Sequence, residues 1–140
     1  MPAGPSLPDM VANAAFFFGA VHSLAADPPD LPFEQAQANF TACAQRGLAA
    51  SIEWNGTRQP VRDVLADLAT RARAGLAAQG VDAAIIDRTM SVIDLRLATA
   101  RNGAAWQLAH HARHGDLRRL TADYLECQRS GAPVHEWPLT

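Results

Sequence analysis

Residues 61–76, VRDVLADLATRARAGL, carry the clearest helical pattern in the chain. The larger apolar residues recur every three or four positions, so they lie along one side of a helix, and charged residues fill the other side. Gly80 follows the pattern and ends it, as a glycine often does after a helix. We therefore expect a helix that buries one face, formed by Val61, Val64, Leu65, Leu68, Ala69, Ala72 and Leu76.

Three more helices are expected after Gly80. Asp82 can cap the first, and Asn102 can cap a second that runs to about His114. Gly115 and Asp116 end that helix and cap the third. Beyond it the tail SGAPVHEWPLT is expected to be extended. The inner face of the first of these helices is expected to consist of Ile86, Met90, Ile93 and Leu97, and that of the third of Leu117, Leu120, Tyr124 and Leu125. Trp137 is the only large anchor of the tail.

Two helices are expected before residue 61. Ser6 and Asp9 have the spacing of a capping box, which predicts a first helix over about 7–26. The prolines of DPPDLP end it, and a second helix follows over about 33–46, closed by Gly47. The apolar stripe of the first helix consists of Met10, Ala14, Phe17, Phe18, Val21, Leu24 and Ala25.

A short hairpin separates these helices from the pattern at 61–76. The segment SIEWNGTRQPV alternates polar and apolar residues around Asn55-Gly56, the strongest short hairpin signal. No repeat or linker divides the chain. The sequence therefore predicts an all-α single domain over residues 1–140, with five or six helices in a compact bundle and one small β-hairpin near residues 51–61.

Composition narrows the class of partner. The net charge is only −2, lysine is absent and the arginines are scattered, which argues against a nucleic-acid or anionic-membrane surface. The most apolar run, 13–26, is too short to span a bilayer, so we expect it to form a buried helix. Two distant cysteines and no signal-peptide pattern favour a reducing cytoplasm. The abundance of alanine and arginine indicates a GC-rich bacterial genome.

Three histidines within five residues raise the question of a metal site. His110 and His114 are four apart and share a helix face, as in zinc-binding helices. The inner stripe of this helix is expected to be Ala105, Leu108, Ala109 and Ala112, so the two histidines should face outward, with Trp106 at the rim. No third ligand has suitable spacing. We expect a solvated or subunit-facing surface, no metal, and no catalytic residues, because no nucleotide-binding or hydrolase motif occurs.

Several phrases, in order, resemble a known family. They are GPSLPDMVANAAFFFGAV, FEQAQANFTACAQRGLAASIEW, GVDAAIIDRTMSVIDLRLATARNGAAWQ and YLECQRSGAPVHEW. Over essentially the whole chain they resemble the C-terminal region of bacterial glutamate–cysteine ligase-like proteins, the carboxylate–amine ligase family. Such ligases, which act in glutathione or thiol biosynthesis, use ATP and Mg to activate the γ-carboxylate of glutamate as an acyl phosphate, which an amine attacks.

The resemblance implies where the chemistry lies. The ATP, metal and glutamate residues of such ligases lie mostly on a large antiparallel sheet formed by the earlier part of the chain, and Met1 falls at that junction. Relatives tend to carry an arginine where Gln37 stands here and a basic residue near Gln45. The residues implied to line the substrate cleft are Asn39, Arg46 and Arg101.

The expected function is therefore the helical C-terminal portion of such a ligase, inactive without the catalytic sheet and with no cofactor of its own. The alternatives are a free-standing helical interaction or dimerisation module, and a small metal-dependent enzyme using His110 and His114. The expected partner is the sheet domain or a second copy, because Phe16, Phe17 and Phe18 cover more than one face of the first helix.

Overall fold

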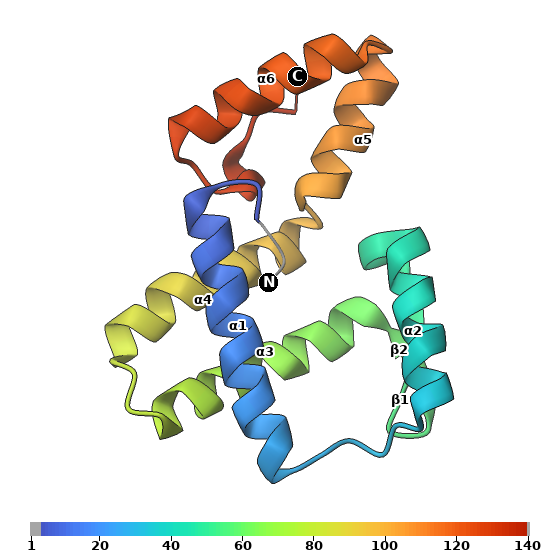
Figure 1. The fold of residues 1–140 in the computed structure, drawn as a ribbon, viewed down its shortest axis with the longest axis vertical. Coiled ribbons are helices and arrows are strands. Elements are labelled where there is room, and N and C mark those ends of the chain that lie inside the picture. Colours follow the sequence, from blue (N-terminus) through green and yellow to red (C-terminus); the bar gives the residue numbers. More distant parts are fainter. Residues whose placement is uncertain (1–3, 140) are drawn as a thin grey trace.

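The computed structural model describes residues 4–139 and confirms a mostly helical fold with one small antiparallel hairpin (Figure 1). The expected helix boundaries are reproduced within one or two residues. The elements, in chain order, are α1 (Leu7–Ala26), α2 (Phe33–Arg46), the 3-10 turn η1 (Gly47–Ala49), β1 (Ser51–Trp54), β2 (Thr57–Pro60), α3 (Val61–Ala78), α4 (Ala83–Thr99), α5 (Gly103–His114), α6 (Leu117–Ser130) and the 3-10 turn η2 (Val134–Glu136).

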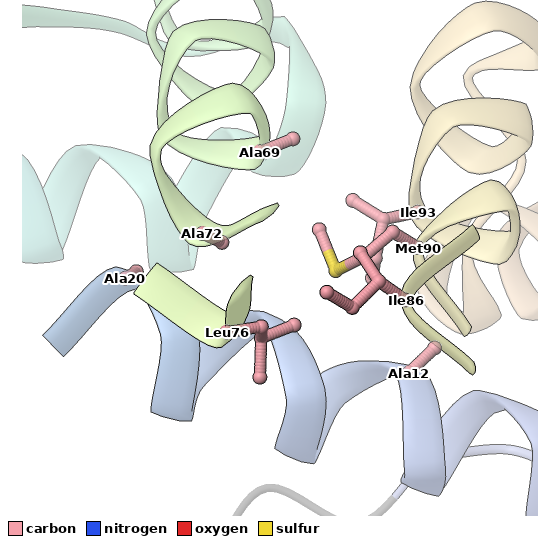
Figure 2. Packing of buried hydrophobic residues seen from close by; sticks show 8 residues of the cluster. All are labelled: Ala12, Ala20, Ala69, Ala72, Leu76, Ile86, Met90 and Ile93. Atoms are coloured by element: carbon pink, nitrogen blue, oxygen red, sulfur yellow. The ribbon is translucent and has the colours of Figure 1, made fainter. Parts of the chain in front are cut away.

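The centre of the fold is the crossing of α1 with α3 and α4. Figure 2 shows alanines of α1 and α3, together with Leu76 of α3, beside the larger side chains of α4. The helices approach closely because Gly19 of α1 lies against Gly75 of α3. A Cβ on Gly19 would lie 2.2 Å from the carbonyl oxygen of Ala72, and one on Gly75 would lie 2.1 Å from that of Gly19. The buried residues of this cluster are Ala12, Ala20, Ala69, Ala72, Leu76, Ile86, Met90 and Ile93.

A second cluster joins the hairpin to α3. Ile52 of β1 and Ala50 are buried against Val61 and Val64, at the start of α3. The turn between β1 and β2 needs two residues with positive φ, and Asn55 (49°) and Gly56 (73°) supply them. The hairpin expected from Asn55-Gly56 is therefore confirmed.

The third cluster joins α5, α6 and the tail. Trp106 of α5 packs edge to face on Trp137, with the ring centroids 5.4 Å apart, and Val134 is fully buried beside them. The tail is not simply extended as expected, because residues 134–136 form the 3-10 turn η2. Trp137 is 1% exposed, so it does anchor the tail.

The side-chain caps follow the expected chemistry. Ser6 accepts a hydrogen bond from the backbone N–H of Asp9 at the start of α1, and Asn102 accepts one from Ala105 at the start of α5. Asp82 and Asp116 accept from the first N–H groups of α4 and α6. These bonds satisfy donors that have no partner inside the helix, and so they determine where each helix begins.

Candidate functional site: an apolar face of α1

The outer side of α1 exposes its largest side chains. The face that packs on α3 and α4 buries the small residues Ala12, Gly19 and Ala20, with Phe16 partly buried beside them. The expected apolar stripe lies on the opposite side, which corrects the expectation that this helix is buried. We call the exposed set the docking face; it comprises Leu7, Met10, Val11, Phe17, Phe18 and Val21, which are 46–70% exposed.

The docking face has the spacing of a helix-packing seam. Leu7, Val11, Ala14, Phe18 and Val21 follow one another at intervals of four and three residues, as the core positions of a coiled coil do. Between Asp9, which is fully buried, and Asp27, α1 carries no charged residue other than the titratable His22. No acidic side chain and no arginine interrupts the seam, and His22 borders it, with its ring centroid 4.5 Å from that of Phe18.

The docking face exposes a large apolar area. Its six apolar side chains are each about half exposed or more. Because a large aromatic side chain has about 150–250 Å² of surface to bury, the exposed apolar area of the six is roughly 500 Å². The largest apolar patch on a typical soluble monomer covers about 300–600 Å² and is often functional. We therefore take this face as the candidate functional site.

A membrane is a weaker explanation for the same helix. α1 is long and apolar enough to cross a membrane, with a mean hydropathy of 1.2 over its best window, and lies near the N-terminus. Core helices of soluble proteins and signal sequences share these properties, so its composition alone assigns no membrane. The small residues facing α3 show that α1 is shaped to pack closely on protein.

The histidines of α5 occupy different positions from those expected. His110 is 2% exposed and stacks on Trp106, which is itself 3% exposed, whereas Leu108, expected inside, is 72% exposed. The expected phase of this helix was therefore wrong. His110 is buried because its Nε2 donates a hydrogen bond to Asp123 of α6 at 2.8 Å. Its ring also contacts that of His114, with the centroids 4.6 Å apart.

Within the part of the chain that the structure describes, these groups do not form a metal centre. In residues 4–139, no three His, Cys, Asp or Glu side chains are grouped so that they could hold a metal ion. A pocket of about 420 Å³ beside Asp123 includes Cys127. Burial raises the pKa of the Cys127 thiol, and the nearby Glu126 and Asp123 carboxylates raise it further, so the nucleophilic thiolate is disfavoured.

The contact between His110 and Asp123 predicts an acid-dependent loss of stability. The hydrogen bond from His110, helped by Arg119, lowers the pKa of Asp123. The pKa of this carboxyl is therefore lower in the folded protein than in the unfolded chain, where it is about 4, and the ionised carboxylate stabilises the fold above that pH. This stabilisation is lost as the pH falls through the pKa of the folded protein. Thermal unfolding should therefore show Asp123→Asn less stable than wild type at about pH 6, and the gap should narrow towards about pH 3.

Asp87→Asn is the matched control, because Asp87 is exposed on α4. It should leave stability close to wild type at both pH values. A gap for Asp123→Asn that stays constant with pH would contradict the proposed contribution of the ionised carboxylate.

The three residues implied by the family resemblance lie in separate places. Asn39, 9% exposed, clamps the hairpin to α2: its Nδ2 donates to the carbonyl of Glu53 at 2.6 Å, and its Oδ1 accepts from the N–H of Glu53 at 3.0 Å. Arg46 is exposed in the last turn of α2. Arg101, between α4 and α5, donates to the backbone carbonyl of Trp137. The structure does not bring them together within this chain.

Sequence reasoning missed a buried ion pair at the start of α1. Asp9 is fully buried, accepts hydrogen bonds from the hydroxyl of Ser6 and the N–H of Val134, and lies 3.2 Å from Nε of Arg96. Burial lowers the pKa of Arg96, and the charge of Asp9 opposes that shift. The capping-box spacing was the only signal at Asp9, and the sequence did not indicate a partner 87 residues away.

Comparison of the chain with protein-family models, with curated proteins and with solved structures finds no match.

Proposed function

We propose that this chain is the helical part of a glutamate–cysteine ligase-like, ATP-dependent carboxylate–amine ligase, and that it docks through α1 on a catalytic antiparallel sheet in the same or another polypeptide. The docking face is the observation that carries this proposal. It is apolar, uncharged and left uncovered by the rest of the fold. The ordered phrases that resemble the C-terminal region of such ligases support the identity of the partner.

The proposed division of labour is structural. The sheet would supply the residues for ATP, Mg and glutamate, and the helices would cover one face of the sheet and exclude water from the cleft. Burying roughly 500 Å² on each side would give an interface of about 1,000 Å², at the lower limit for a specific contact. Because the three residues implied by the family resemblance lie apart in this chain, the bound sheet would have to extend over all three for them to line one cleft. They are Asn39, Arg46 and Arg101.

A charge placed in the docking face should abolish association with the sheet. The experiment mixes this chain with the separately produced sheet segment of a glutamate–cysteine ligase-like protein and measures binding by calorimetry. Phe18→Glu should weaken binding by about a hundredfold or more, because a carboxylate would be buried against apolar surface. Phe40→Glu is the control, since Phe40 is 75% exposed on α2, and it should bind as wild type. Equal binding by both variants would overturn the assignment of this face.

This chain by itself should not bind MgATP with micromolar affinity. It contains no phosphate-binding glycine loop, and residues 4–139 hold no carboxylate cluster suited to a divalent cation. Calorimetry with MgATP should give no saturable heat for the chain, and the mixture with the sheet segment should bind the nucleotide. Micromolar binding by the chain alone would show that the nucleotide site does not reside on the sheet.

A second candidate function is self-association as a dimerisation module. The uninterrupted seam of α1 favours it, because a second copy offers the same uncharged face across a two-fold axis. Light scattering decides between the two functions: a wild-type dimer that Phe18→Glu converts to a monomer would favour the module. Phe16 is a poorer probe than Phe18, because the structure places it partly buried against the core of α1, α3 and α4.

A further inference from the structure

A small pocket opens between the three central helices, on a side of α1 that the docking face does not use. Its volume is about 170 Å³. Its apolar floor is built by Phe16 of α1, Leu65 of α3 and both Ile93 and Leu97 of α4. An apolar cavity of about 150 Å³ is large enough for one benzene ring. The pocket is thus the size of a single aromatic ring or a short branched chain.

The polar groups that remain available to a ligand in this pocket are hydrogen-bond donors. Asn13 uses its Oδ1 to accept from Nη1 of Arg96 at 2.8 Å, and Asn102 uses its Oδ1 to cap α5. Within residues 4–139, neither amide nitrogen donates a hydrogen bond. Both residues line the pocket.

Arg96 adds a cation to the same edge. Its guanidinium has five N–H groups, of which one on Nη1 donates to Asn13 and one on Nη2 donates to the carbonyl of Asp9. One N–H on each terminal nitrogen is left. The carboxylate of Asp9 balances the charge from the Nε side, and none of the described residues that line the pocket is acidic.

We propose that this pocket binds a small carboxylic acid with a compact apolar body, of the size of benzoate or 3-methylbutanoate. The ring or branched chain occupies the floor formed by Phe16, Leu65 and Ile93. The carboxylate accepts hydrogen bonds from Arg96 and from the amides of Asn13 and Asn102, which are the donors that a carboxylate needs. The site is separate from the docking face and does not depend on the ligase proposal.

The test titrates benzoate into the isotopically labelled chain and follows amide and methyl chemical shifts. We expect saturable binding in the millimolar range, with intermolecular nuclear Overhauser contacts from the benzoate ring to Phe16 and Ile93. Benzamide has the same shape without the charge, and should bind about tenfold more weakly because it loses a charge-assisted hydrogen bond.

Two substitutions on α4 complete the test. Leu97→Phe fills the pocket and should weaken benzoate binding about tenfold or more, whereas Leu95→Phe, at a position that is 45% exposed and outside the pocket, should leave it unchanged. Equal affinity for benzoate and benzamide, absence of saturation, or contacts from the ring to other parts of the chain would each overturn the proposal. The contacts in wild type decide the matter even if Leu97→Phe does not fold.

Discussion

Gly75→Ala is expected to destabilise the fold by about 3 kcal/mol, even though alanine is the better helix former by about 1 kcal/mol. The new Cβ would lie 2.1 Å from the carbonyl oxygen of Gly19, which is backbone and cannot rotate away. The two helices would have to separate, and the close contact between α1 and α3 would be lost. Denaturant unfolding of the two proteins measures the difference.

Ala74→Gly tests the same helix at an exposed neighbouring position. It should cost about 1 kcal/mol through helix propensity alone. If Gly75→Ala proved more stable than wild type, propensity would outweigh packing at this site. The close crossing of α1 and α3 would then be wrong.

Asp9→Ala is expected to cost about 3–5 kcal/mol, the range observed when one partner of a buried ion pair is removed. The substitution leaves the guanidinium of Arg96 buried without its counter-ion. It also removes the acceptor for the N–H of Val134, which holds the C-terminal tail against α1. Equilibrium unfolding followed by circular dichroism measures the loss, and tryptophan fluorescence reports whether the tail is released.

The matched control is Asp94→Ala, which breaks the ion pair with Arg73 at the surface. There the aspartate side chain is 51% exposed and the arginine 30% exposed, so the cost should be below about 1 kcal/mol. Similar losses for Asp9→Ala and Asp94→Ala would show that burial does not strengthen the contribution of Asp9.

The element boundaries were predictable because local chemistry sets them. Ser6, Asp82, Asn102 and Asp116 each accept hydrogen bonds from the first turn of the helix that follows. The hairpin likewise depends on Asn55-Gly56, whose backbone conformation is a property of those two residues. Such signals need no information about distant parts of the chain.

The inward faces of α1 and α5 were not predictable by the same means. In α5 the alanines give little hydrophobic signal, and His110 is buried because Asp123, on another helix, hydrogen bonds to it. In α1 the hydrophobic stripe indicated the wrong side, because close approach to α3 requires Gly19 and small neighbours. Periodicity identifies the largest apolar side chains, whereas a close helix crossing selects the smallest.

The candidate site was predictable only in part. The run Phe16–Phe17–Phe18 indicated that one helix has more apolar surface than a small domain can enclose, and Phe17 and Phe18 are indeed 60% and 48% exposed. The contacts of Asp9 with Arg96 and Val134 could not be inferred, because they join segments that are distant in sequence. The pocket beside Asn13 depends on the same distant packing.

Photo-crosslinking from α1 tests the central claim most directly. A benzophenone amino acid at position 18 reports what covers the docking face in the mixture with a ligase sheet segment, and the same group at position 108, on the exposed side of α5, serves as control. The account predicts crosslinks from position 18 to the sheet segment, mapped by mass spectrometry, and few from position 108. Crosslinking to the sheet from position 108 but not from position 18 would contradict the account.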